Sequence, residues 1–192
     1  MNQSGMPIQA LATVVLLVVL ACAAWQDLAR HRIPNSLNLT GLLLGLALAG
    51  LSGGLTAVAY AAAGVLVGFG MLLPFHLLRG MGAGDVKLMA AAGAFLGPGA
   101  ALLAAALTLV TGAVLGIAIV CWRIAERSAE PRGQVEGSAA MEVPAIWRAL
   151  AAASIAGKER FPYAVAIALG VMISAGLYGH FDGLFAALPA AG

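Results

Sequence analysis

The chain has 192 residues, of which 62% are hydrophobic and 9% charged, and its net charge is +2. A soluble domain has about 45–50% apolar and about 25% charged residues, so this composition excludes a water-soluble globular protein. The small net charge also excludes a nucleic-acid-binding protein that works by charge alone. Each transmembrane helix needs about 20 apolar residues, which limits the chain to about six spans. The sequence therefore predicts an all-α, polytopic membrane protein.

Glycine and proline divide the chain into apolar segments. In chain order, these segments are Ile8–Trp25, Ser36–Leu51, Leu55–Leu78, Val86–Leu96, Ala100–Trp122 and Pro162–Gly179. The fourth segment is only about 16 Å long as a helix, about half of a hydrocarbon core. Either it extends beyond these bounds or it crosses only part of the bilayer. The run Phe181–Ala190 is too short to span and is expected at the membrane interface.

The first segment is expected to stay in place as a helix. It has no Lys or Arg before it, so it lacks the positive region of a signal peptide. Small-x-x-x-small pairs, which favour close helix contact, follow in later segments. They are Gly41/Gly45, Gly64/Gly68 and Gly112/Gly116.

The basic residues predict the orientation of the chain. All ten Lys and Arg residues lie in three loops: after the first segment (Arg30, Arg32), around the start of the fourth (Arg79, Lys87), and in the 123–161 loop. The positive-inside rule puts these loops in the cytoplasm and both termini outside. We therefore expect one membrane-embedded domain, 1–192, in the cell (inner) membrane, with the 123–161 loop on its cytoplasmic side.

The sequence predicts no metal, cofactor or disulfide. Cys22 and Cys121 lie far apart in apolar runs, and His31 and His76 have no third ligand at a suitable spacing. Within the 123–161 loop, Pro144–Ala156 is expected to form an amphipathic helix on the membrane surface.

Two acidic residues stand at the predicted cytoplasmic edge of the bilayer. Asp27 ends the first segment, and Asp85 opens the fourth. Acids at membrane depth are costly and are therefore candidates for a functional site. Two carboxyl groups held close together share a proton, so that one takes a proton from water while the other donates to a scissile carbonyl. Gly82 and Gly84 fit this chemistry, because a loop without side chains lets a substrate backbone approach the acid.

Each of these residues also has a structural interpretation. Asp85 suits a helix N-cap, and Asp27 suits an ion pair with Arg30 or Arg32. Pro34 and Asn35 suit a turn and cap before the second segment.

Lys87 has two interpretations of its own. It suits a side chain that anchors the helix at the interface, or one that tunes the neighbouring Asp85.

The combination resembles the type IV prepilin peptidase family of membrane aspartic proteases. The matching elements are Asp27, Arg32-Ile33-Pro34-Asn35, Gly82-Ala83-Gly84-Asp85-Val86-Lys87 and Phe161-Pro162-Tyr163. The resemblance implies a catalytic pair, Asp27 and Asp85. It also implies supporting or substrate-binding roles for other residues of these motifs, namely Gly82, Gly84, Lys87, Arg32, Pro34 and Asn35.

The resemblance also implies a substrate: a prepilin with a short basic leader before an apolar helix, cut after a glycine on the cytoplasmic side. Bifunctional members carry an N-terminal extension with paired Cys-x-x-Cys motifs and a methyltransferase activity. The chain has no such pairs, so we expect the short, peptidase-only form of tight-adherence (Flp) pilus systems. Components of a pilus or secretion assembly are further expected partners.

Two other functions compete with the peptidase. One is a proton-coupled transporter or channel subunit in which Asp85 relays protons. The other is a scaffold of a pilus or secretion assembly in which the acids only cap helices. Cleavage without proton or solute flux separates the peptidase from the transporter, and loss of cleavage on removal of either acid separates it from the scaffold.

Overall fold

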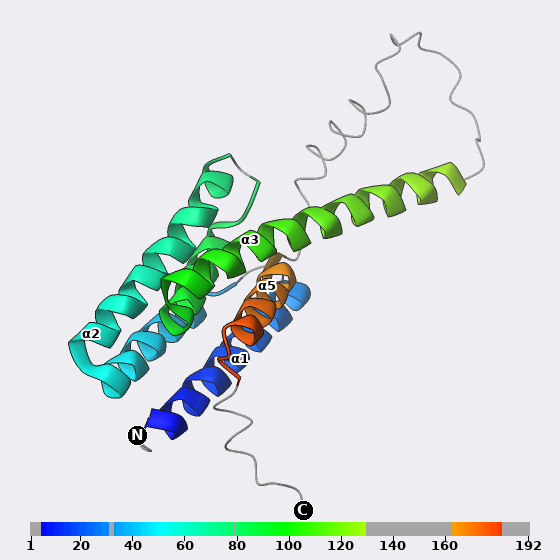
Figure 1. The fold of residues 1–192 in the computed structure, drawn as a ribbon. Helices are drawn as coiled ribbons and strands as arrows, with labels where there is room; N and C mark the ends of the chain where they lie inside the picture. Colours follow the sequence, from blue (N-terminus) through cyan, green and yellow to red (C-terminus); the bar gives the residue numbers. More distant parts are fainter. Residues whose placement is uncertain (1–4, 31–32, 79, 130–162, 182–192) are drawn as a thin grey trace, which may run out of the picture. The chain divides into compact units, whose positions relative to one another are not determined.

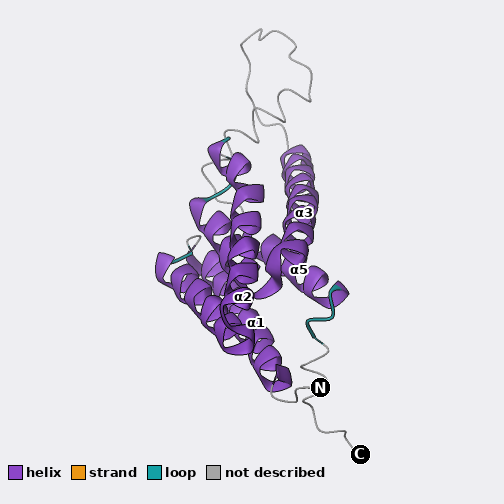
Figure 2. Cartoon of the chain, turned by 60° about the vertical axis from the view of Figure 1, so that its left-hand side comes forward, coloured by secondary structure: helices purple, strands orange, loops and turns teal. Residues whose placement is uncertain are grey.

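The computed structural model describes residues 5–30, 33–78, 80–129 and 163–181. Its elements are α1 (Gly5–Arg30), α2 (Asn35–Leu77), α3 (Ala83–Ala129) and α5 (Tyr163–Leu177). Figure 2 shows that these described elements are all helices, which confirms the predicted all-α class. The predicted surface helix Pro144–Ala156 and residues 182–190 of the C-terminal run lie outside the described part.

The chain forms two compact units, residues 1–112 with 162–192, and residues 113–161. The site and its supports belong to the first unit. By length and composition, three helices are suited to cross a membrane, and α5 is a shorter apolar helix.

Both long helices break where the sequence predicts a turn. In α2 the break lies at Gly53 and Gly54 (φ 63°), and Figure 1 shows the chain doubling back there. In α3 it lies at Gly97 (φ 73°), which Pro98 follows. Positive φ favours glycine, and a side chain at Gly97 would also collide with the ring of Tyr60. The two halves of α2 and of α3, with α1 and α5, thus match the six predicted apolar segments in position.

The first half of α3 is the most enclosed helix of the first unit. Almost every side chain from Asp85 to Leu96 is buried, and Leu88 and Met89 are fully so. A helix that is apolar all round is expected to be covered by protein. This half starts at Ala83 and breaks at Gly97, so it is about 21 Å long. The predicted fourth segment therefore extends back beyond Asp85, and neighbouring helices cover it.

Glycines of α2 let the first half of α3 approach closely. A Cβ at Gly64 would collide with the Gly93 carbonyl oxygen, and one at Gly68 would lie 2.6 Å from the Met89 carbonyl oxygen. A Cβ at Gly45 would lie 2.8 Å from the Cβ of Ala94, so this third glycine makes room for a small side chain of α3. Backbone thus packs on backbone, the mode that small-x-x-x-small pairs favour.

Helix α5 runs antiparallel to α1 and to the second half of α3. Ser174 donates a hydrogen bond to the Ala100 carbonyl at 2.7 Å, and Thr111 donates one to Ala166 at 3.3 Å. Thr13, early in α1, donates to the His180 carbonyl at 2.9 Å.

Gly179 ends helix α5. Gly179 adopts φ 70°, and the His180 amide donates to the Ala175 carbonyl at 2.9 Å. This is the pattern of a Schellman C-cap, which ends a helix at a glycine.

One face of α1 is apolar and exposed, as expected of a helix that contacts lipid. Leu11, Val14, Val18 and Trp25 recur at helical spacing, and between 41% and 73% of each is exposed. Monomeric soluble proteins rarely expose such a continuous apolar stripe, whereas a membrane helix does.

Candidate active site

Asp27 lies in the last turn of α1 and is bound by the start of α5. Its side chain is 6% exposed, and its Oδ2 accepts a hydrogen bond from the Ala164 amide at 3.1 Å. Ala164 is the second residue of α5, where amides have no acceptor within their own helix. The carboxylate therefore satisfies a free donor, and the partial positive charge of the helix N-terminus favours the acid there.

Asp85 lies in the first turn of α3 and is 8% exposed. Its Oδ2 accepts a hydrogen bond from the Gly82 amide at 3.1 Å, and its own amide donates to the Gly82 carbonyl at 3.2 Å. This reciprocal pair resembles a capping box, in which the third helical residue reaches back to the cap. The helix starts at Ala83, so Asp85 caps from inside the first turn and is not the N-cap residue that the sequence suggested.

The two glycines beside Asp85 are required by close contacts. A Cβ at Gly82 would lie 2.9 Å from Asp85 Oδ2, and a Cβ at Gly84 would lie 3.3 Å from Ile33 Cβ. A side chain at either position would press on the acid or on the neighbouring Ile33. The glycines thus shape the loop itself.

The start of α2 holds this loop from the other side. Asn38 donates from Nδ2 to the Gly84 carbonyl at 3.0 Å, and Lys87 Nζ donates to Asn35 Oδ1 at 3.0 Å. Pro34 is the N-cap of α2, which has no side-chain cap, so the expected capping role of Asn35 is wrong. Lys87 is exposed, and its described hydrogen-bond partner is Asn35.

The first turn of α5 connects the two acids. The Ala164 amide donates to Asp27, and the adjacent Tyr163 lies within electrostatic range of Asp85. A Cβ at Gly112 would lie 3.2 Å from the Tyr163 ring, so α3 packs against this turn of α5 at Gly112. The first turn of α5 thus lies near both acids, which are distant in the sequence.

Arg32 was also named from the sequence as a supporting residue, and His31 and His76 were considered as metal ligands. Arg32 and His31 lie outside the described residues. His76 Nδ1 lies 3.0 Å from the Met81 carbonyl oxygen, within the turn that leads to Asp85. In the described ranges, no group of three or more His, Cys, Asp or Glu side chains is placed to hold a metal ion.

Asn38 and Ala164 were not identified from the sequence as site residues. Ala164 acts through its backbone amide, which every residue but proline has, so no side-chain pattern could reveal it. Asn38 had one usable signal: it is a polar residue on the otherwise apolar second segment, one turn after Asn35.

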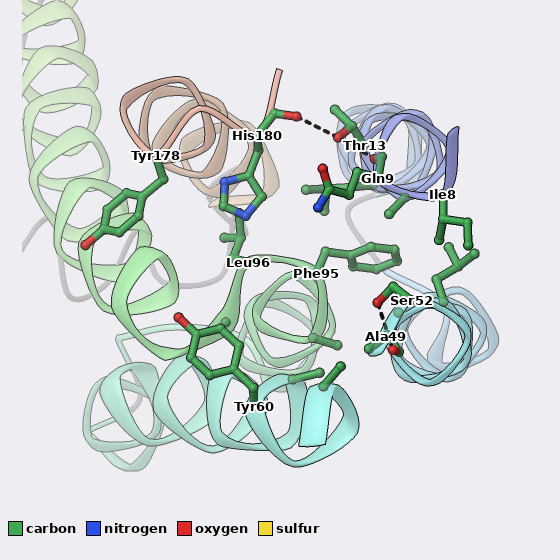
Figure 3. A pocket seen from close by; sticks show the side chains of 18 of the residues that line it. Ile8, Gln9, Thr13, Ala49, Ser52, Tyr60, Phe95, Leu96, Tyr178 and His180 are labelled. Atoms are coloured by element: carbon green, nitrogen blue, oxygen red, sulfur yellow. Dashed lines mark hydrogen bonds between the residues drawn. The ribbon is translucent and has the colours of Figure 1, made fainter. Parts of the chain in front are cut away.

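A pocket of about 470 Å³ lies at the opposite end of these helices (Figure 3). Thr13, Tyr60, Gly97 and His180 line it, and neither acid does. His180 is half-buried, its Nδ1 has no hydrogen-bond partner among the described residues, and burial lowers its pKa. This pocket is therefore separate from the acids.

Fold and site together define a helical membrane protein with two buried acids, one at the end of α1 and one at the start of α3. The profile of the type IV leader peptidase family matches residues 14–117, a range that includes both acids and ends before α5. The chain belongs to this family.

Similar proteins include the prepilin leader peptidase/N-methyltransferases of Aeromonas salmonicida (strain A449) and Aeromonas hydrophila. Each is 39% identical over 120 residues, which cover 59% of this chain and 41% of the relative. The chain thus aligns with less than half the length of these relatives. No solved structure matches it.

Proposed function

We propose that the chain is a membrane aspartic endopeptidase that removes the leader of prepilins, with Asp27 and Asp85 as its catalytic pair. The observation that carries this proposal is that both acids are buried near the first turn of α5, Asp27 at the Ala164 amide and Asp85 within electrostatic range of Tyr163. Family membership supports the reaction and the substrate class.

The chemistry needs only water and the two acids. Carboxyl groups at close quarters do not both ionise readily, so one proton is shared between them. The ionised partner removes a proton from water as it attacks the scissile carbonyl, and the protonated partner donates to the carbonyl oxygen. Buried surroundings strengthen both interactions with the developing charge. No covalent intermediate is required.

The test is cleavage of a purified prepilin by the full chain in detergent or vesicles. Asp27→Asn and Asp85→Asn should each abolish cleavage, while the protein accumulates in the membrane as the wild type does. Asp182→Asn is the matched control, because it removes a carboxyl from the predicted outer tail and should cleave normally. If either of the first two variants cleaves at the wild-type rate, the pair is wrongly assigned.

We propose that the acids face the cytoplasm, in a chain of six spans with both termini outside. The loop charges support this orientation. Single cysteines replace the exposed residues Ala29 and Ala83 near the acids and Ser52 at the other end, in a chain without Cys22 and Cys121. An impermeant thiol reagent should reach Ser52→Cys in intact cells, and the other two only after the inner face is opened. Labelling of Ala29→Cys and Ala83→Cys from opposite sides contradicts the proposal.

We propose the peptidase-only, tight-adherence (Flp) type of activity. The composition, rich in alanine and glycine, supports it, and its substrate would be a prepilin with a short basic leader and an apolar helix. That apolar helix stays in the bilayer while the leader reaches the acids, so a groove between helices and open to lipid is the expected binding site. Preferential cleavage of an Flp-type prepilin over one from a classical type IV pilus tests the assignment, and the reverse preference contradicts it.

A further inference from the structure

Asn38, which lies outside the Gly82–Asp85 loop, holds this loop by a hydrogen bond. It lies in the first turn of α2 and is 4% exposed. Its Nδ2 donates to the carbonyl of Gly84, the residue immediately before Asp85, at 3.0 Å. Two further hydrogen bonds, both between Gly82 and Asp85, are internal to the loop.

The orientation of this carboxamide is fixed by its partner. A backbone carbonyl can only accept a hydrogen bond, so the amide nitrogen must face Gly84 and the oxygen must point away. Asn38 Oδ1 is buried and has no hydrogen-bond partner among the described residues. A buried polar atom without a partner destabilises a fold. The carboxamide thus leaves one of its own atoms without a described partner in order to donate to the Gly84 carbonyl.

From this arrangement we infer that Asn38 is a positioning residue that fixes Asp85 for catalysis through the Gly84 carbonyl. The inference rests on the proposed peptidase function. Asn38 does not touch substrate in this account, because its donor is used within the protein. Its contribution is to hold the backbone from which the acid projects, and small displacements of a catalytic group lower the rate steeply.

The isosteric substitution Asn38→Asp tests the donor itself. When the introduced carboxyl group is ionised, it presents an oxygen without hydrogen to the Gly84 carbonyl, so the bond is lost. When the group is protonated, it carries an O–H that can donate in the same place. The rate of this variant relative to the wild type should therefore rise as pH falls, at least 5-fold between pH 8 and pH 5.5. Asp27, Asp85 and Lys87 are present in both proteins, so the ratio to the wild type corrects for pH effects that the two proteins share.

Asn38→Leu is the matched control, because it removes the donor at every pH. Its kcat should be at least 10-fold below that of the wild type, with KM within 2-fold and a ratio to the wild type that does not change with pH. If Asn38→Leu does not accumulate, Asn38→Asp alone still decides, since its ratio to the wild type is compared at two pH values.

An Asn38→Asp ratio that stays flat or falls toward acid pH overturns the inference, even if the wild type cleaves prepilin. A wild type that cleaves nothing instead overturns the proposed function. In that case the melting temperatures in detergent are compared over the same pH range. The deficit of Asn38→Asp should then shrink at acid pH, and a constant deficit overturns the hydrogen bond to Gly84.

Discussion

Replacement of Ala164 by proline removes the amide that holds Asp27 while leaving α5 able to form. Proline is tolerated in the first turn of a helix, where its missing N–H has no helical acceptor to lose. Ala164 is the second residue of α5, and its amide is the described donor to Asp27 Oδ2 at 3.1 Å. The substitution therefore tests the connection between α5 and the first acid.

The size of the effect follows from the geometry. The proline δ-carbon takes the place of the amide hydrogen, about 1.5 Å from the nitrogen. Since Asp27 Oδ2 lies 3.1 Å from that nitrogen, less than about 2 Å would remain. Atoms in ordinary contact are about 3.5 Å apart, so the carboxylate must move away by about 1.5 Å. A hydrogen bond to a charged group, worth about 1.5–3 kcal/mol, is also lost. A misplacement of about 1 Å can lower a rate about 100-fold, so we expect kcat to fall about 10- to 100-fold.

The assay is steady-state cleavage of a prepilin by purified protein, with the melting temperature measured in parallel. Ala164→Gly is the matched control: it weakens the helix and removes a buried Cβ but keeps the amide donor. Its kcat should stay within about 3-fold of the wild type. An Ala164→Pro protein with wild-type kcat, or a Gly variant as slow as the Pro variant, would refute the reasoning.

Three further predictions concern stability and the periphery of the site. Gly64→Ala should lower the melting temperature, because its Cβ collides with a facing backbone carbonyl, whereas Gly70→Ala in the same helix meets nothing within 4 Å and should be neutral or slightly stabilising. Equal melting temperatures for the two variants would contradict the packing. Burial lowers the pKa of His180, so its stabilising contribution is present above about pH 6.5 and is lost as pH falls through the lowered pKa. The melting temperature of the wild type should therefore drop more between pH 7.5 and pH 5 than that of His180→Gln, and parallel drops would contradict it. Lys87→Ala removes an exposed hydrogen bond to Asn35 and should change kcat less than about 3-fold; a loss above 30-fold would place Lys87 in the chemistry.

The features that the sequence predicted well are those with strong local signals. The breaks at Gly53–Gly54 and Gly97 follow from glycine and proline within apolar runs, and the structure has non-helical angles at these glycines. Asp27 and Asp85 stood out because charge is rare in such segments, and the structure buries both of them.

The features that the sequence missed depend on contacts between distant segments. The bond from Ala164 to Asp27 is made by a backbone amide, and only the packing of α5 along α1 brings it there. The sequence suggested Asp85 as the N-cap, whereas α3 starts at Ala83 and Asp85 is its third residue. Helix ends are difficult to locate from sequence. No helical pattern in the sequence indicated that His180 would be buried. It is half-buried because α5 ends beside the start of α1.

The late position of α5 in the chain has a consequence for biosynthesis. Ribosomes deliver both acids long before Ala164, so a nascent or prematurely terminated polypeptide has two carboxyl groups in the membrane but not the turn that gathers them. Under the proposed mechanism, the site is therefore complete only after α5 has been synthesised and has packed along α1.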